Sequence, residues 1–100
     1  MAFFEGAVLR GAHLGGANLS EAFFIRVDAT RAIFLGASMA NADLSHAKLH
    51  EADFTQADLT GANLHRIDDT NTVWTLCNRQ SVRLTDPDLA AAEDWQPPNA

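Results

Sequence analysis

Histidines and carboxylates are the residues of this chain that could carry chemistry. Four histidines are present, at His13, His46, His50 and His65. His46 and His50 lie four residues apart, which on a helix would turn both imidazoles to one face and suggest a metal site. The surrounding sequence repeats every five residues and is not helical, so the two side chains belong near adjacent corners of a turning chain. We therefore favour solvated turn residues and predict no metal and no other cofactor.

No catalytic residue is predicted either. Paired catalytic acids need a cleft and environments that separate their pKa values, and the carboxylates of this chain are spread evenly along it. No glycine stands in the strand-to-helix context of a phosphate loop. Cys77, the single cysteine, has no evident histidine or aspartate partner and is expected to be a packed thiol, with no intrachain disulfide. We predict that the chain is not an enzyme.

A five-residue repeat must position all of these side chains. From Ala2 to about Leu76, alanine recurs every fifth residue, with a large apolar residue two places after it. In an α-helix these apolar residues would not share one face, because each step of five residues rotates the side-chain direction by roughly 140° about the helix axis. The spacing of two is typical of an extended piece, and the Ser, Thr, Gly, Asn or His residues that follow favour a turn. An extended piece and a turn, repeated without insertion, indicate a solenoid.

Units such as Ala42-Asp-Leu-Ser-His and Ala57-Asp-Leu-Thr-Gly resemble the pentapeptide repeat family, whose consensus is A(D/N)LXX. The resemblance covers about three quarters of the chain. It implies an all-β fold, a right-handed quadrilateral parallel β-helix with four pentapeptides per coil. It also implies that the central Leu or Phe and the Ala point inward, and that the consensus Asp or Asn faces outward. About 3.5 coils are expected.

A longer period is visible without the family. Arg26-Val-Asp-Ala-Thr30 recurs forty residues later as Arg66-Ile-Asp-Asp-Thr70, which corresponds to two coils of twenty. Winding the chain with twenty residues per coil predicts an inner core of four stacks of side chains. In the fourth stack, Ala29 and Asp69 stand where a large apolar residue is expected. The predicted core residues are Phe4, Phe24, Leu44 and Leu64; Leu14, Phe34, Phe54 and Trp74; Leu19, Met39 and Leu59; Leu9 and Leu49. The same folding places Arg26, His46 and Arg66 together as a basic corner.

The repeat degrades after Arg66, and we predict two regions, a β-helix over 1–76 and a C-terminal cap over 77–100. The cap is expected to hold an irregular return segment or a final strand over 77–84, a short helix over about 87–94 and a Pro-containing tail. Asp86 is the predicted N-cap and Pro87 the first helical residue. A helix of this length is too short to stand alone. We expect it to dock Leu89, Ala92 and Trp95 over Trp74 and Leu76, closing the end of the core.

Composition narrows the class of partner. Thirteen acidic residues against seven Lys and Arg give a net charge of −6, which argues against direct binding of nucleic acid. No signal peptide opens the chain and no apolar run reaches membrane-spanning length, so no membrane contact is expected. With one cysteine, a soluble bacterial-type protein of the cytoplasm is the default expectation.

Five apolar residues at outward positions are the candidate partner surface: Phe3, Phe23, Ile25, Ile33 and Leu35. Single exposed apolar residues are also normal on monomeric proteins, and this alternative stays open. No capping segment precedes the first coil, which would let that end of the β-helix pair with a second copy or an upstream domain. We therefore predict a protein partner and a possible homodimer.

Three functions fit these observations. We favour a non-catalytic structural or protein–protein interaction module. The resemblance supplies an alternative, because some family members resemble B-form DNA and inhibit or protect DNA gyrase, a type II topoisomerase. Fewer than four coils at about 4.8 Å each would span roughly half a duplex turn, so mimicry would require a dimer. The third possibility is a small accessory or effector domain with its partner encoded nearby.

Overall fold

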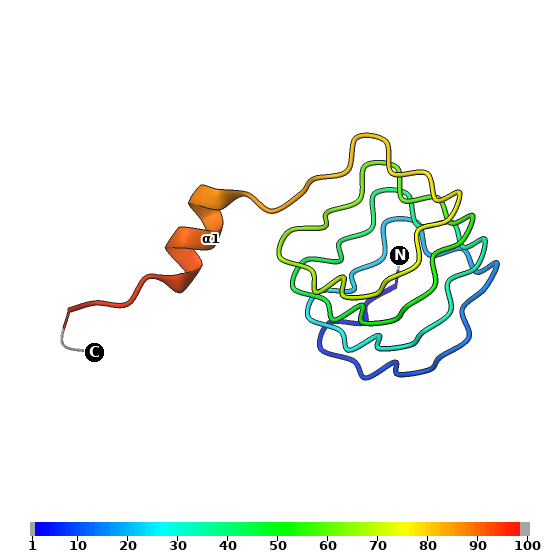
Figure 1. Ribbon diagram of the computed structural model, residues 1–100, viewed down its shortest axis with the longest axis horizontal. Coiled ribbons are helices and arrows are strands. Elements are labelled where there is room, and N and C mark those ends of the chain that lie inside the picture. Colours follow the sequence, from blue (N-terminus) through cyan, green and yellow to red (C-terminus); the bar gives the residue numbers. More distant parts are fainter. Residues whose placement is uncertain (1, 99–100) are drawn as a thin grey trace.

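The computed structural model describes residues 2–98, whose backbone winds into a parallel β-helix (Figure 1). Isolated bridges recur every fifth residue, and each joins a residue to the one twenty positions later, from Phe3 with Phe23 to Asn63 with Arg83. Twenty residues therefore make one coil with four short sides, which confirms the period deduced from the repeat. Met1, Asn99 and Ala100, at the ends of the two predicted regions, lie outside the described residues.

Each corner is a tight turn closed by a backbone hydrogen bond. The Ala47 N–H donates to the Leu44 carbonyl at 3.0 Å, and the residue before the alanine, His46, has a φ of 61°. A positive φ at the third residue is the signature of a type II turn. The consensus Asp supports the next corner, since the Asp58 carboxylate accepts the Thr60 N–H at 3.0 Å and its hydroxyl at 2.6 Å. The repeat therefore encodes extension and turning in each unit.

The predicted inner stacks are confirmed. Phe34 and Phe54 stack at 4.6 Å between ring centroids, and Phe54 stacks on Trp74 at 4.9 Å. The central residues of the second and third coils have essentially no exposed surface, whereas three of the four in the first coil, and Trp74, are only partly buried. The buried stack residues are Leu19, Phe24, Ala29, Phe34, Met39, Leu44, Leu49, Phe54, Leu59 and Leu64; the partly buried ones are Phe4, Leu9, Leu14 and Trp74.

The β-helix continues past the predicted boundary at residue 76, so that boundary and the count of 3.5 coils were wrong. Asn78 pairs with Asp58 and Arg83 pairs with Asn63, which completes a fourth coil. The consensus is lost there because the inner positions of this coil face the end of the solenoid and need not be apolar. Asp69 is exposed, and the Arg79 guanidinium lies 4.9 Å from the centre of the Trp74 ring.

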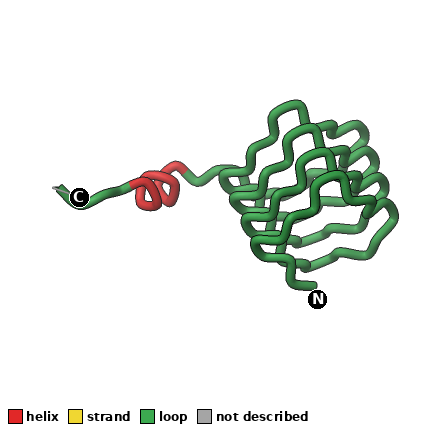
Figure 2. The backbone as a smooth tube through the Cα atoms, turned by 90° about the horizontal axis from the view of Figure 1, so that it is seen from below, coloured by secondary structure: helices red, strands yellow, loops and turns green. Residues whose placement is uncertain are grey.

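One helix, α1 (Pro87–Asp94), follows the last coil. Its predicted start is confirmed, because the Asp86 side chain accepts the N–H groups of Asp88 and Leu89. Its predicted docking over the end of the core is wrong. No residue of α1 is buried, and α1 lies beside the solenoid (Figure 2).

The three side chains expected to cap the core do not bury themselves against it. Leu89 is 48% exposed, Ala92 is exposed and Trp95 is 67% exposed, while Leu76, their expected neighbour, is 77% exposed. The physical reason is that the apolar side chains of α1 form no strong stripe, whereas its acidic C-terminal end has cationic partners on one corner of the β-helix.

Candidate functional site

One corner of the β-helix carries a column of basic side chains. Arg26, His46 and Arg66 occupy the same turn position in three successive coils, with φ values of 58°, 61° and 54°. The twenty-residue register stacks them along the solenoid axis, as the sequence predicted. With His65, the residue before Arg66, we call this group the basic corner.

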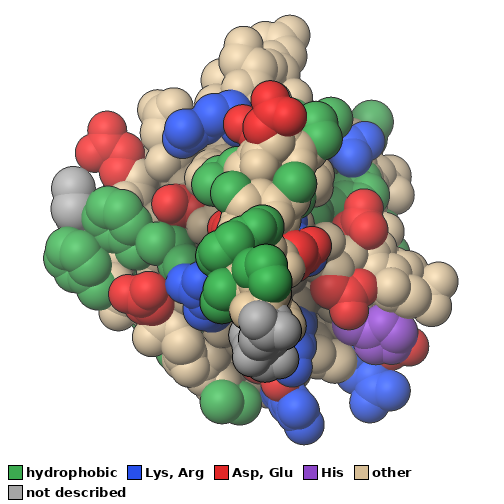
Figure 3. Space-filling model, turned by 90° about the vertical axis from the view of Figure 1, so that its left-hand side faces the viewer, with side chains coloured by type: hydrophobic (Ala, Val, Ile, Leu, Met, Phe, Trp, Pro, Cys, Tyr) green, Lys and Arg blue, Asp and Glu red, His purple; other side chains and the backbone are tan. Residues whose placement is uncertain are grey.

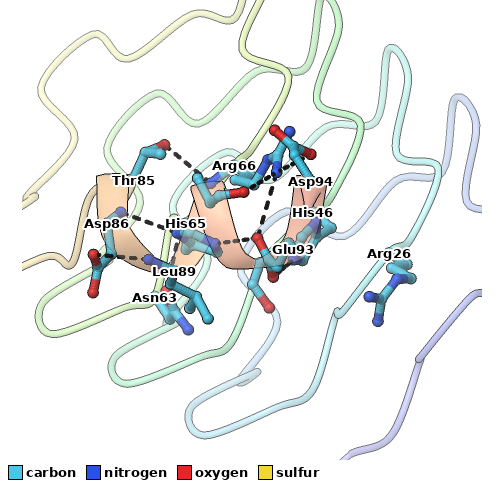
Figure 4. Close-up of polar contacts among 12 residues, drawn as sticks. Arg26, His46, Asn63, His65, Arg66, Thr85, Asp86, Leu89, Glu93 and Asp94 are labelled. Carbon is cyan, nitrogen blue, oxygen red and sulfur yellow. Dashed lines mark hydrogen bonds and ion pairs between the residues drawn. The ribbon is translucent and has the colours of Figure 1, made fainter. Parts of the chain in front are cut away.

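Helix α1 lies against the basic corner through its last turn (Figure 4). The Glu93 carboxylate bridges two imidazoles, with one oxygen 2.9 Å from His46 Nε2 and the other 2.8 Å from His65 Nε2. The Arg66 guanidinium donates to the Asp94 carboxylate at 2.8 Å and to the Ala90 carbonyl at 3.2 Å. The two adjacent acids of α1 therefore match three of the four side chains of the basic corner.

His65 is the most enclosed member of the basic corner. It is 4% exposed, and the neighbouring corner residue Ser45 is 8% exposed, although corner positions of the β-helix point outward. The Asp86 N–H donates to His65 Nδ1 at 3.1 Å, so the neutral ring carries its proton on Nε2 and donates it to Glu93. His65 thus links both ends of α1 to the β-helix.

Charge reinforces these contacts. The hydrogen bond from His65, assisted by His46, lowers the pKa of Glu93 below its ordinary value. The hydrogen bond to Asp94 raises the pKa of Arg66. Both shifts favour the charged forms, so Glu93 and Arg66 stay ionised where α1 meets the corner.

A solvent-open pocket of about 550 Å³ separates part of α1 from the β-helix; it is lined by Arg26, His46, Arg66, Glu93 and Asp94. Arg26 lines it without a hydrogen bond or ion pair to α1 within residues 2–98, and its nearest acid is Glu5 at 4.0 Å. The pocket therefore offers one guanidinium that α1 does not use.

His46, His65 and Glu93 also form the donor set of a possible metal site, with ligand atoms within 4.8 Å of one another. Two histidines and a glutamate suit zinc. Two features of the site oppose a cation. His65 Nε2 carries a proton while Nδ1 accepts the Asp86 N–H, and the Arg66 guanidinium lies 3.5 Å from Glu93. The arrangement suits a carboxylate better than a metal ion.

The five predicted surface residues do not form one patch. Phe3 and Phe23 stack at 5.1 Å on one side of the β-helix, with Ile25 half-buried at the next corner. Ile33 pairs with His13 and Asp53, which places it and Leu35 half a coil away on another side. Apolar side chains on the face that carries α1 also gather in separate groups with charges between them (Figure 3). Sequence reasoning missed Val8, which is largely exposed on a third side.

The remaining reactive groups are engaged in structure. The Thr30 hydroxyl and Arg10 lower the pKa of Asp28 to about 2, and threonine hydroxyls likewise lower the pKa values of Asp58 and Asp68. Burial raises the pKa of the Cys77 thiol. Carboxylates held ionised are poor general acids and a protonated thiol is a poor nucleophile. Residues of the Asp-Xaa-Thr type signal this turn-supporting role in the sequence.

The fold and the repeat together define a parallel β-helix protein with four sides to each coil. The family profile described as Pentapeptide repeats (8 copies) matches residues 2–24, 7–41 and 37–68, and the chain belongs to this family. Its right-handed β-helix is accordingly the fold of this chain.

Solved structures of other pentapeptide repeat proteins share the fold. Rfr23 from the cyanobacterium Cyanothece 51142 is 22% identical with a TM-score of 0.82, and the match covers 83% of this chain and 56% of that one. A protein from the thylakoid lumen of Arabidopsis thaliana is 29% identical with a TM-score of 0.64, covering 81% and 57%. One from Nostoc Pcc 7120 is 23% identical with a TM-score of 0.75, covering 82% and 84%.

The match thus spans little more than half the length of the first two of these structures. No curated protein gives a significant match to the chain. Within residues 2–98, no helix combines the length and apolar character needed to cross a bilayer.

Proposed function

We propose that this pentapeptide repeat chain is a non-catalytic module that binds another protein through the side of its first two coils that carries Phe3 and Phe23. The observation that carries the proposal is the outward Phe3–Phe23 stack, in which Phe3 is 74% exposed. In the following coils the same column holds polar residues, namely Asp43, Asn63 and Arg83.

An outward-facing aromatic pair is an unusual feature of a repeat whose other outward residues are mostly polar. Aromatic side chains supply a large apolar area at little conformational cost, and they dominate the binding energy of many interfaces. Ile25 and Arg26 follow Phe23 at the next corner, so apolar and cationic groups adjoin there. The surface therefore fits a partner that offers apolar side chains and carboxylates.

A non-catalytic role is supported by the state of the reactive groups. The outward Asp28, Asp53 and Asp58 side chains accept hydrogen bonds from the threonines that follow them, and Cys77 is partly buried. The same bonds orient these carboxylates along the β-helix for turn support. DNA mimicry toward gyrase therefore stays an alternative without a specific supporting feature, and a supercoiling assay at micromolar protein tests it directly.

The proposal is tested by comparing partners recovered with the wild type, with Phe3→Asp and with Leu35→Asp. Leu35 is 46% exposed on another side, so Leu35→Asp is a matched control for an added charge. We expect Phe3→Asp alone to lose the partner. Recovery of the same proteins by all three baits would contradict the proposal. Light scattering on the same samples tests the predicted homodimer, which remains a prediction, as does the accessory or effector role.

A further inference from the structure

Hydrogen bonds and ion pairs hold helix α1 on the β-helix. No residue of α1 is buried, and these polar contacts are made by Glu93, Asp94 and the Ala90 carbonyl, preceded by the Thr85 hydroxyl and the Asp86 N–H. Helices of eight residues are marginal without tertiary packing, and partly exposed ion pairs contribute little stability. Helix α1 is therefore poised to leave the basic corner while the β-helix stays folded.

The basic corner itself is built without α1. The Arg26 N–H donates to the Ser45 carbonyl at 3.0 Å, and the His46 N–H donates to the His65 carbonyl at 2.9 Å. These bonds join successive coils, and the inner stacks behind them are fully buried. The spacing of the cationic side chains is thus set by the coil repeat, and the corner persists as a preorganised site when α1 moves away.

Helix α1 fills this site incompletely. Its two acids engage His46, His65 and Arg66, whereas Arg26 lines the pocket of about 550 Å³ without bonding to either acid. In Figure 4, Arg26 lies beyond His46 with no dashed line to α1. A segment with a further carboxylate would reach Arg26, and guanidinium groups bind carboxylates in a paired geometry.

We propose that the basic corner of Arg26, His46, His65 and Arg66 is a docking site for an acidic segment of a partner protein, and that α1 occupies it in cis as a competitor. This inference rests on the proposed function, since it names the chemistry of the partner. The partner segment carries adjacent carboxylates, as α1 does at Glu93 and Asp94. Ile25 precedes Arg26 at the same corner and gives an apolar residue of the partner a contact beside the charges.

The test uses the full chain and a labelled peptide with the sequence of residues 85–96, TDPDLAAAEDWQ, as the acidic probe. Fluorescence anisotropy measures its affinity for the wild type and for the double variant Glu93→Gln/Asp94→Asn, which weakens the cis contacts. We expect the double variant to bind about tenfold more tightly, because the fraction of open sites divides the intrinsic dissociation constant. Equal affinity would overturn the proposal.

Two matched controls locate the effect. Asp88→Asn removes one acid from the first turn of α1 but leaves Glu93 and Asp94 in place, and its affinity for the probe is expected to equal that of the wild type. A probe with Gln and Asn in place of Glu93 and Asp94 is expected not to bind. Binding of this neutral probe with unchanged affinity would show that the carboxylates are not recognised and would overturn the proposal.

A third variant separates this inference from the proposed function. Adding Arg66→Gln to the double variant removes the partner of the Asp94 carboxylate and is expected to weaken probe binding several-fold, whereas adding Phe3→Asp is expected to leave it unchanged. Unchanged binding with Arg66→Gln would remove the corner as the site. The two proposals can also fail separately. If the probe binds the corner as expected but the Phe3→Asp bait recovers the same partners as the wild type, the proposed apolar surface is wrong and the corner stands.

Other ligands of the same corner are distinguished by competition. Inorganic phosphate at the concentration of the probe is expected to leave the probe bound. Zn²⁺ at the same concentration is also expected not to displace the probe. Release of the probe by equimolar phosphate would assign the corner to small anions and overturn the docking of a protein segment. Zinc binding to the wild type, measured by calorimetry and lost in Glu93→Gln, would assign it to a metal and overturn the proposal equally.

Discussion

The interior of the second and third coils and the corner beneath α1 are held together in opposite ways. In the interior, the side chains of Phe24, Phe34 and Phe54 are fully buried and pack through apolar surface. At the corner, Glu93 and Asp94 join α1 to the β-helix through ionised groups, and no α1 residue is buried. Because the two regions are held by different interactions, we expect the free energy of α1 docking to be separable from that of folding. The corner could then exchange ligands while the β-helix stays folded.

The largest effect is expected inside the stacks. Phe54→Ala removes a ring that stacks on both Phe34 and Trp74, and it should lower the free energy of unfolding by about 3–5 kcal/mol. Urea denaturation followed by circular dichroism measures this loss. Phe3→Ala is the matched control, because Phe3 is exposed and should cost far less. Equal losses for the two variants would erase the distinction between interior and surface.

A smaller, local effect is expected at the corner. His65→Ala removes the acceptor of the Asp86 N–H and a donor to Glu93, which should weaken α1 docking by about 1–3 kcal/mol. Limited proteolysis should then cut between the last coil and α1, with little change in the melting temperature of the β-helix. His50→Ala is the control, since His50 pairs with the neighbouring Glu51 and makes no hydrogen bond or ion pair with α1 among residues 2–98. Loss of the whole fold in His65→Ala would show that α1 and the solenoid are one cooperative unit.

Acid should release α1 before it affects the interior. The pKa of Glu93 is lowered below 4.5 in the folded chain, chiefly by the His65 hydrogen bond. A depressed pKa means that the Glu93 contribution is complete above 4.5 and is lost as the pH falls through the lower folded value. The groups that face this carboxylate from the β-helix are Arg66, His46 and His65.

NMR spectra recorded from neutral pH down to about 3 check this prediction, since the ordinary Glu pKa is about 4.3. Resonances of Glu93, Asp94 and Trp95 should shift together, while those of the inner residues stay in place. In Glu93→Gln the same resonances should already show the released position at neutral pH. Unchanged α1 resonances across the whole range would contradict the role given to the Glu93 carboxylate.

The smallest effect is expected in the turns, away from both regions. Gln56 adopts a φ of 59°, a conformation that glycine adopts more readily. Gln56→Gly should therefore raise the free energy of unfolding by up to about 1 kcal/mol. Gly16→Ala, with a φ of 69° and open space around the added Cβ, is the reverse control and should lower it. A thermal melt measures both, and a stabilised Gly16→Ala would refute the account of the corners.

Much of the fold was predictable because the repeat is local and periodic. Folding the chain at twenty residues places Phe34, Phe54 and Trp74 in one stack, and the structure confirms it. The same operation places Arg26, His46 and Arg66 at one corner. The second half of the fourth coil was missed because Asp69 and Arg79 replace apolar residues at inner positions of that coil, where no further coil within the described residues packs on them.

The docking of α1 was not predictable from the same reasoning. Its start is encoded locally by Asp86 and Pro87. Its position depends on contacts between residues that are distant in the sequence: Arg66 and Asp94 are separated by 28 positions, and His46 and Glu93 by 47. Such contacts leave no periodic trace in the sequence. An apolar side chain like Leu89 suggested a cap over the core, whereas charge at Glu93 decided where α1 lies.

Native-state hydrogen exchange tests the separation of corner and interior most directly. Amides in the second and third coils, such as those of Phe34 and Leu44, should exchange only through global unfolding. Amides of α1, including the Ala90 N–H that donates to Asp86, should exchange through an opening of much lower free energy. Glu93→Gln/Asp94→Asn should lower that opening energy further without changing protection in the coils. Equal protection of α1 and the central coils would contradict the account.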